Sequence, residues 1–371
     1  MSIFHQPWEL VPNHIRGKGG PQGRVGWHCG REIDKFRGVY PPVDYDAGSE
    51  AWIGSVTHVQ NAPADKPYYG CSEVTLPDGR RMYLFEAIAL NPEEVLGKKH
   101  IEKNGTGLGM LIKYLDAQTQ YGLQCHPTRP WAKKMWNSDY GKEESWYVIS
   151  TRDDTAEPAY ILLGFKEGVT REEWEKYYYA DDLKALENLC HKIPVKAGEA
   201  YFVGGGCPHA LGEGCFVIEV QEPSDITLGA HPYNATPAAW RGDVSEERFN
   251  ERLLGAYVYD GCSYEENLKR WRAPRKVIRQ GDWGSESIVI GPAQTKYFSF
   301  TELDVNSETE IRHTGFPQVA IVLDGEGELT WEGGSMKISK AKELFFPTDI
   351  PNFRVKGKVR LILCNPEGVE F

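Results

Sequence analysis

The chain ends in a series of short strand-like segments that are evenly spaced and separated by glycine turns. Each segment is rich in β-branched and aromatic residues, and none is long enough for a membrane span or a long helix. Several such segments in succession are typical of a β-sandwich or a closed barrel. We therefore expect a small jelly-roll-like β domain over residues 276–371, built on the segments 296–305, 318–325, 327–334, 344–349 and 359–365.

The rest of the chain also has strand character, but with helical interruptions. A chain of 371 residues exceeds the size of about 250–300 residues at which single cores stop growing, so more than one domain is expected. We predict a first domain over residues 1–240, a helical connector over 241–275, and the β domain over 276–371. The predicted fold class is mostly β with helical insertions, and strand-like segments of the first domain lie at 146–150, 158–165, 200–203 and 215–221.

Three capping patterns predict where helices begin. Asn91 precedes Pro92, a proline at the first helical position, and a glutamate follows three residues after the cap. Thr170 and Ser263 each precede a glutamate at the same spacing, which is the pattern of a capping box. The apolar segment 108–117 is compatible with either a helix or a strand.

Charge and cysteine usage exclude several classes of function. The net charge is −11, which disfavours nucleic acid and anionic lipid as partners, so any anion site must be local. The N-terminus lacks the apolar segment of a secretory signal. The eight cysteines form no C-x-x-C pair, which favours reduced thiols and a cytoplasmic location over a disulfide framework.

The residues that suggest chemistry occur in three short motifs. Gln124 and His126 are two residues apart, so in a strand they share one face. Lys142 and Glu144 have the same spacing, and His209 follows a glycine-rich turn. Two imidazole nitrogens, a carboxylate and an amide oxygen form a plausible donor set for Zn²⁺, and the harder oxygen ligands leave Mn²⁺, Fe²⁺ or Co²⁺ open.

Each of these signals is weak when taken alone. A single histidine in a strand is more often a hydrogen-bonded core residue than a ligand, and a glutamine in a strand is rarely one. The pair Cys207 and His209 is an alternative metal-ligand pair, but no second thiolate pair completes it. Most lysines are solvated surface charges.

Together, however, the motifs resemble the class I mannose-6-phosphate isomerases, which are cupin-fold enzymes. The family pattern is Q-x-H-P, then G-K-x-E-x-W-Y, then a loop ending in H-A-x-G. The resemblance covers about residues 45–225 and includes the segments 48–52, 90–97, 113–117, 195–199, 219–221 and 224–227.

The resemblance implies a cupin barrel as the catalytic domain and a zinc site made by Gln124, His126, Glu144 and His209. It also implies aldose–ketose isomerisation of a hexose or hexose phosphate through a cis-enediol. Lys142 is then the candidate base or proton shuttle, and Lys113 a second cation for a phosphate or an enediolate oxygen. Asp225 and Arg241 are the candidate substrate-binding residues.

One departure from the family pattern affects the expected activity. The family has an arginine four residues after the aspartate that corresponds to Asp225, and here that position is Gly229. Glu222 also adds a negative charge where the family has glutamine. We therefore expect weak activity on mannose 6-phosphate unless Arg241 or Arg129 takes the place of the missing arginine.

Three functions remain open from the sequence. The first is the metal-dependent sugar isomerase, acting on a small-molecule sugar or sugar phosphate as a monomer or homodimer. The second is another metal cupin enzyme, such as an oxygenase or epimerase, although a glutamine ligand argues against iron–oxygen chemistry. The third is a non-catalytic sugar-binding protein descended from the isomerases, which the missing arginine favours.

The β domain contains a single histidine, His313, so we expect no metal there.

Overall fold

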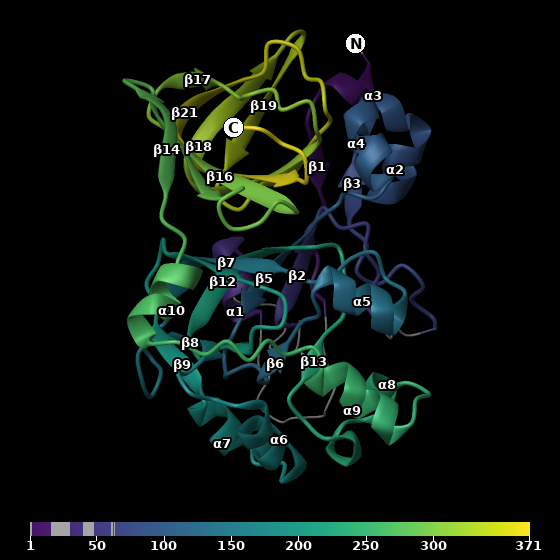
Figure 1. Cartoon of the computed structure of the whole chain (residues 1–371). Coiled ribbons are helices and arrows are strands. Elements are labelled where there is room, and N and C mark those ends of the chain that lie inside the picture. The colour runs from purple at the N-terminus through teal and green to yellow at the C-terminus, as the bar shows by residue number, and fades with distance from the viewer. Residues whose placement is uncertain (1, 16–29, 40–47, 61, 63) are drawn as a thin grey trace.

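The computed structural model of the chain describes residues 2–15, 30–39, 48–60, 62 and 64–371. Three β-sheets stack along the long axis of the molecule, and helices lie at the end opposite the C-terminal sheet and along the sides (Figure 1). The predicted fold class, mostly β with helical insertions, is confirmed.

The C-terminal sheet contains eleven strands among the described residues, and most of them come from residues 276–371. Three strands near the N-terminus extend it, because β1 pairs with β20 and β3 pairs with β1. The first residues of the chain thus complete a sheet of the β domain, which the sequence did not predict. The strands are β1 (Trp8–Leu10), β3 (Glu73–Thr75), β4 (Arg81–Tyr83), β14 (Lys276–Gly281), β15 (Gly284–Ile290), β16 (Phe298–Val305), β17 (Glu308–Glu310), β18 (Gln318–Trp331), β19 (Gly334–Ser339), β20 (Glu343–Phe346) and β21 (Arg354–Pro366).

The middle sheet has the strand order β10-β7-β12-β5-β2 and lies directly below the C-terminal sheet in Figure 1. Its strands are antiparallel, so residues directly opposite each other share a face. One face packs into the same hydrophobic core as the C-terminal sheet, as Ile218 and Tyr147 show together with Phe300. The strands are β2 (Glu50–Ile53), β5 (Leu111–Asp116), β7 (Glu144–Thr151), β10 (Ala200–Val203) and β12 (Cys215–Gln221).

The outer sheet has the order β13-β6-β11-β8-β9 and packs against the other face of the middle sheet. Trp146 and Val217 of the middle sheet share a core with Ile161 and Leu211 of the outer sheet. The segment 108–117, which the sequence left open, forms the strand β5. The outer strands are β6 (Gln124–Cys125), β8 (Tyr160–Phe165), β9 (Cys190–Pro194), β11 (His209–Leu211) and β13 (Leu228–Gly229).

Three helices begin directly after the capping residues that the sequence indicated. The side chains of Asn91, Thr170 and Ser263 each accept a hydrogen bond from a backbone N–H in the first turn of a helix. The helices are η1 (Ile3–His5), α1 (Arg31–Phe36), α2 (Leu84–Leu90), α3 (Pro92–Leu96), α4 (Lys98–Asn104), α5 (Arg129–Trp136), α6 (Arg171–Tyr179), α7 (Leu183–Asn188), η2 (Tyr233–Ala235), α8 (Ala238–Arg241), α9 (Glu246–Leu254) and α10 (Tyr264–Trp271). The last three of these occupy the predicted connector and its approach, and the domain boundaries at 240 and 275 stay predictions.

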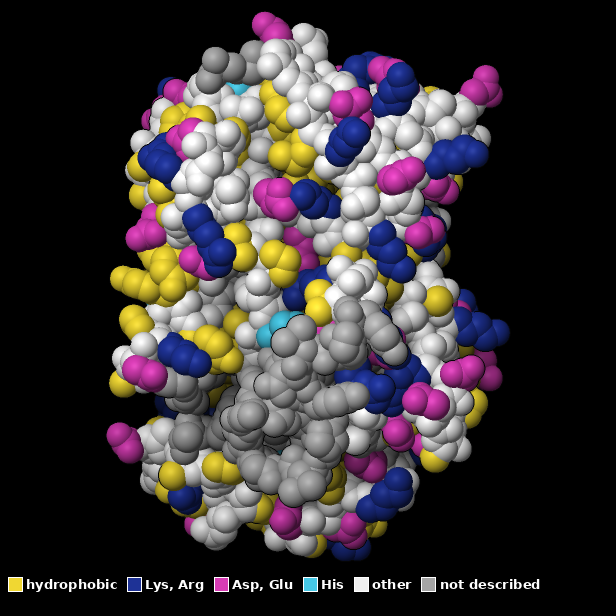
Figure 2. Space-filling model, turned by 180° about the vertical axis from the view of Figure 1, so that it is seen from behind, with side chains coloured by type: hydrophobic (Ala, Val, Ile, Leu, Met, Phe, Trp, Pro, Cys, Tyr) yellow, Lys and Arg dark blue, Asp and Glu magenta, His cyan; other side chains and the backbone are white. Residues whose placement is uncertain are grey.

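The surface carries both signs of charge. On the described part of the face in Figure 2, Lys and Arg side chains are interspersed with Asp and Glu. No helix among the described residues is both long and apolar enough to cross a membrane. Seven cysteines are free thiols in the structure, and Cys29 lies outside the described residues.

Candidate metal centre

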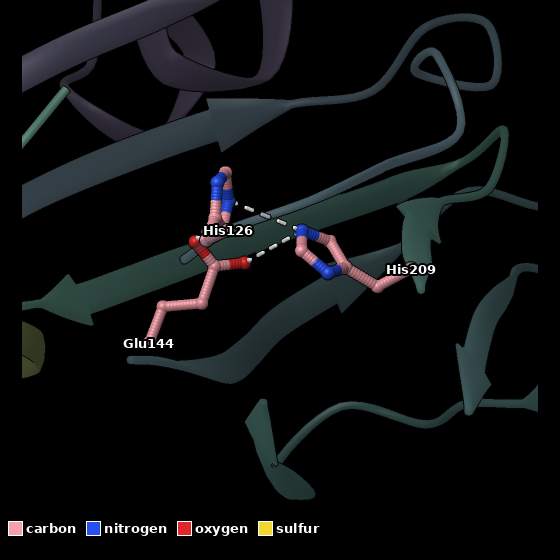
Figure 3. Close-up of side chains that lie close together, drawn as sticks. All are labelled: His126, Glu144 and His209. Atoms are coloured by element: carbon pink, nitrogen blue, oxygen red, sulfur yellow. Dashed lines mark hydrogen bonds and ion pairs between the residues drawn. The ribbon is translucent and has the colours of Figure 1, made fainter. Parts of the chain in front are cut away.

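Three side chains from three strands point toward one another between the middle and outer sheets (Figure 3). His126 follows β6, Glu144 begins β7, and His209 begins β11. Their nitrogen and oxygen atoms all lie within 4.8 Å of one another, and all three residues are buried. This is the one such group of three or more His, Cys, Asp or Glu residues in the part of the chain that the structure describes.

Backbone carbonyls fix the tautomer of both imidazoles. Nδ1 of His126 lies 3.0 Å from the carbonyl oxygen of Ile226, and Nδ1 of His209 lies 2.9 Å from that of Cys207. A carbonyl can only accept a hydrogen bond, so each Nδ1 carries the proton. Both Nε2 lone pairs therefore face the centre, as is common for histidines that bind metals.

The spacing of the donor atoms suits a small divalent cation. The two Nε2 atoms lie 3.2 Å apart, and the Glu144 oxygens lie 3.1 Å from Nε2 of His126 and 3.3 Å from Nε2 of His209. In a tetrahedral site with bonds of about 2.0–2.1 Å, donor atoms lie about 3.3–3.4 Å apart. Apart from the Lys142 ammonium, which lies 3.2 Å from Oε2, no donor among the described residues engages the Glu144 oxygens. Two imidazole lone pairs and a buried carboxylate therefore face the same point.

Electrostatics in the centre favour deprotonated donors. Burial lowers the pKa of both His126 and His209, and the charge of Lys142 lowers that of His126 further. Burial alone would raise the pKa of Glu144, but the nearby positive charges, with Lys142 foremost, together outweigh it and the pKa is lowered. Neutral imidazoles and an ionised carboxylate are the forms that bind a metal.

Gln124 and Lys142 also reach the donor atoms of the centre. Gln124 is the Cα partner of His209 in the ladder between β6 and β11, and its Nε2 lies 3.3 Å from Nε2 of His209. Rotating the amide by 180° places the oxygen at the same position. Nζ of Lys142 lies 2.8 Å from Nε2 of His126 and 3.2 Å from Oε2 of Glu144. The structure thus brings together the four predicted ligands and the predicted base.

Lys113 lies in a row of charged residues on the same face of the middle sheet. Its Nζ is 3.0 Å from Oε2 of Glu219 and 3.9 Å from Oε2 of Glu50, and it lies 5.2 Å from the centre of the Trp52 ring. Sequence reasoning did not select Glu50 and Glu219 as site residues. Glu219 could have been noticed because it is the one charged residue in the apolar strand 215–221. It also lies two residues before Gln221, which is opposite Glu144, so Glu219 and Glu144 share a face.

The two predicted substrate-binding residues lie in different settings. Asp225 is buried, and its Oδ2 accepts a hydrogen bond of 2.9 Å from the backbone N–H of Gln60. Arg241 ends α8 and stacks on Tyr233, with 4.3 Å between the guanidinium carbon and the ring centre. Among the described residues, Arg241 forms no hydrogen bond or ion pair with the donor set, and both roles stay predictions.

Gly229, where the family has arginine, lies next to the centre. It is the Cα partner of Gln124 across β13 and β6, so a side chain here would emerge on the same face as the Gln124 amide. Among the described residues, the nearest atom to a Cβ built at Gly229 is Cδ2 of His231, at 3.9 Å. The described neighbours therefore leave space for a side chain.

Arg129 and Glu222 behave differently from the expectation. We expected Glu222 to add a negative charge beside the site that disfavours a phosphate, and we considered Arg129 as a substitute arginine. The Glu222 side chain is fully buried, and Oε2 accepts a hydrogen bond of 2.5 Å from Nε of Arg129. The two charges compensate each other, so Glu222 is not a free negative charge beside the site. The guanidinium of Arg129 is held by Glu222 and Glu367.

Cys207 is buried in the core between the two sheets, and burial raises its pKa well above the ordinary range. Its thiol donates to the carbonyl oxygen of Pro208 at 3.6 Å, while its own carbonyl orients His209. The thiol thus packs as an apolar side chain, and the backbone of Cys207 supports the metal centre.

The chain is similar to known proteins both in sequence and in fold. The family model "Mannose-6-phosphate isomerase, cupin domain" matches residues 291–366. The chain is 28% identical over 263 residues to "Putative mannose-6-phosphate isomerase YvyI" of Bacillus subtilis, covering 70% of this chain and 76% of the relative. It is 26% identical over 257 residues to the mannose-6-phosphate isomerase of Streptococcus mutans, covering 68% of this chain and 72% of the relative.

Solved structures share the fold over nearly the whole chain. The mannose 6-phosphate isomerase of Bacillus subtilis superposes with a TM-score of 0.72 at 22% identity, covering 97% of this chain and 99% of that one. A zinc-bound mannose 6-phosphate isomerase gives a TM-score of 0.73 at 15% identity, with coverages of 97% and 99%. The chain is thus similar to mannose-6-phosphate isomerases in sequence over about 70% of its length, and it shares the fold of solved members over 97% of its length.

Proposed function

We propose that the chain is a metal-dependent aldose–ketose isomerase, with Zn²⁺ as the metal, that interconverts a hexose or hexose phosphate through a cis-enediol. The observation that carries the proposal is the convergence of two Nε2 lone pairs and a buried carboxylate, with Nζ of Lys142 within 3.2 Å of that carboxylate. The names of the relatives support the reaction class.

The predicted ligands are Gln124, His126, Glu144 and His209. When bound, a divalent metal supplies the Lewis acidity that polarises the sugar oxygens. Nδ1 of His126 and Nδ1 of His209 each donate a hydrogen bond to a backbone carbonyl oxygen, and these bonds fix the orientation of both rings. The burial of the donor set excludes water and strengthens every electrostatic contact in the site.

Lys142 is the proposed base, because its amine lies at the edge of the donor set, where C1 and C2 of a sugar would meet it. A base must come within about 2.6–3.2 Å of the atom whose proton it moves. It takes the proton from one carbon and returns it to the next. Lys113 then offsets negative charge on the enediolate oxygens, as preorganised cations do, while Glu50 and Glu219 hold its ammonium in place.

A second function is favoured by one specific observation. The position beside Gln124 is Gly229, so the cation that the family places there is missing. A protein with this site binds a sugar without converting it if no other group stabilises the enediolate. We therefore retain a non-catalytic sugar-binding role as the alternative.

The test combines metal analysis with a panel of sugars. Purified protein is analysed for bound metals and assayed with mannose 6-phosphate, fructose 6-phosphate, mannose, fructose and other sugars. We expect stoichiometric Zn²⁺ and aldose–ketose conversion that is lost on chelation and restored by Zn²⁺. Binding of a sugar without conversion favours the alternative, and oxygen consumption with bound Fe²⁺ favours another metal cupin enzyme.

A further inference from the structure

Arg129 lies close in sequence to the predicted metal ligand His126, but its side chain contacts residues of the C-terminal β domain. It begins α5, three residues after His126. Its Nε donates to Oε2 of Glu222 at 2.5 Å, and its Nη2 donates to Oε2 of Glu367 at 3.4 Å. The guanidinium carbon lies 3.5 Å from the centre of the Tyr297 ring. Two residues of the β domain thus fix the side chain.

Glu222 links Arg129 to the segment 141–144, which contains Lys142 and Glu144. Its Oε1 accepts a hydrogen bond of 3.2 Å from the backbone N–H of Glu143, and its own N–H donates to the Glu143 carbonyl at 3.0 Å. Glu143 lies between Lys142 and Glu144 in the sequence. The carboxylate of Glu222 therefore restrains the backbone from which the proposed base and one predicted ligand project.

The segment is also pressed against the start of α5. The N–H of Lys142 donates to the carbonyl oxygen of Pro127 at 3.0 Å. A Cβ at Gly141 would lie 2.6 Å from the backbone nitrogen of Arg129, so only glycine permits this approach. Three segments that carry site residues, around 126–129, 141–144 and 221–222, meet at one Arg–Glu pair.

We propose that Arg129 is a positioning residue through which the β domain fixes Lys142 and Glu144 relative to the two imidazoles. The inference rests on the metal centre of the proposed function and adds a role for the β domain beyond packing. Without the guanidinium, Glu222 would be a buried carboxylate without its cation, which is unfavourable. It would turn toward solvent and release the backbone of Glu143.

The experiment uses full-length protein loaded with Co²⁺, whose d–d absorption reports ligand geometry. The main variant is Arg129→Met, which keeps a long apolar side chain, and Arg129→Lys tests rescue by the retained charge. The matched control is Arg279→Met. Arg279 donates through Nε to Oε2 of Glu286 at 2.5 Å, is 28% exposed beside a carboxylate that is 1% exposed, and lies within the β domain.

We expect Arg129→Met to raise the Co²⁺ dissociation constant by about 10-fold to 100-fold, the scale for groups that orient metal ligands, and to shift the d–d bands. Arg129→Lys should recover part of both changes, and Arg279→Met should change neither. If Arg129→Met fails to fold, Glu367→Gln, which removes one contact only, should shift both readouts in the same direction by less.

The outcomes separate the two proposals. A wild-type protein that binds no Co²⁺ overturns the metal centre and this inference with it. A wild-type protein that binds Co²⁺, with Arg129→Met within twofold of it and unchanged bands, overturns the inference alone. Equal shifts in Arg129→Met and Arg279→Met also overturn it, because they would report general destabilisation.

Discussion

The two faces of the middle sheet use the same strands for opposite purposes. On the face toward the C-terminal sheet, Ile218 opposes Tyr147 and Tyr114 and is fully buried in an apolar core. On the face toward the outer sheet, Glu219 opposes Trp146 and Lys113 and belongs to a row of charges. Because side chains alternate with a period of two, adjacent residues of one strand serve stability and chemistry separately.

This separation predicts that substitutions one residue apart have different consequences. A change of a charged residue on the face toward the outer sheet should alter the site and leave the fold intact, whereas a change of an apolar residue on the opposite face should do the reverse. The charged face tolerates its buried charges because they are paired, since an isolated charge in such a place is strongly unfavourable.

The largest effect on the site is expected when both imidazoles are removed. The double substitution of His126→Ala with His209→Ala should abolish metal binding while the protein stays folded, because a core of this size does not depend on one ion. Elemental analysis and circular dichroism measure the two outcomes. Full metal occupancy in the double variant would sink the assignment of the ligands.

The next largest effect concerns proton transfer. Lys142→Met should lower kcat by about 100-fold or more on the sugar that the panel identifies, which is the usual scale for loss of acid–base help. The bound metal should be retained, as measured by elemental analysis. An unchanged kcat would reject the role of Lys142 as the base.

A gain of function is expected at Gly229. Gly229→Arg should raise kcat/KM on mannose 6-phosphate by about 10-fold or more, since one well-placed charge donor is worth roughly 100-fold to 1,000-fold in rate. The control is Gly229→Met, which fills the same space without charge. Wild-type kcat/KM at or above about 10⁵ M⁻¹s⁻¹, typical of efficient enzymes, would show that the arginine is not missed.

The apolar face should respond in stability alone. Ile218→Ala should lower the free energy of unfolding by about 2–5 kcal/mol, the range for such truncations in a packed core. Metal content per folded protein should not change. Denaturant unfolding and elemental analysis on the same sample test this, and loss of metal at unchanged stability would break the comparison between the faces.

Asp116 is the exception on the apolar face, and it predicts a pH effect without an effect on the site. Its Oδ2 accepts from the N–H groups of Gly30 and Glu32 at 3.0 Å each, which caps α1. Burial raises its pKa to about 6. The folded state therefore holds this proton more tightly than the unfolded state, and the contribution of Asp116 to stability falls as the pH rises from about 4 to 6.

The matched variant for this effect is Asp116→Asn, which cannot ionise. The difference in unfolding free energy between wild type and Asp116→Asn should shift against the wild type over this pH window, by at most about 3 kcal/mol. Denaturant unfolding at several pH values measures it. A difference that is constant with pH would contradict the assignment.

The sequence predicted the local features of the fold well, for physical reasons that are local themselves. The capping residues Asn91, Thr170 and Ser263 satisfy backbone donors within the next turn, so their neighbours in the sequence suffice to identify them. The metal motifs were identifiable because strand alternation sets which side chains share a face. The resemblance to a known family joined motifs that the sequence separates by more than 80 positions.

Long-range partners were beyond the reach of the sequence. Nothing near Arg129 indicates that Glu222, Tyr297 and Glu367 surround it, because each comes from a different part of the chain. The ion pair of Glu222 with Arg129 was missed for the same reason, because the sequence shows the charge of Glu222 but not its partner. Glu50 was missed because its relation to Lys113 depends on the pairing of β2 with β5.

The pairing of β1 with β20 has a consequence for synthesis. Trp8 pairs with Phe345, so β1 leaves the ribosome long before its partner strand β20 does. Contacts that distant in sequence are slow to form, and until β20 emerges, β1 has an open edge available to other chains. A fragment that begins at residue 276 would carry the complementary open edge on β20, so we expect it to aggregate or exchange strands instead of folding as a soluble unit.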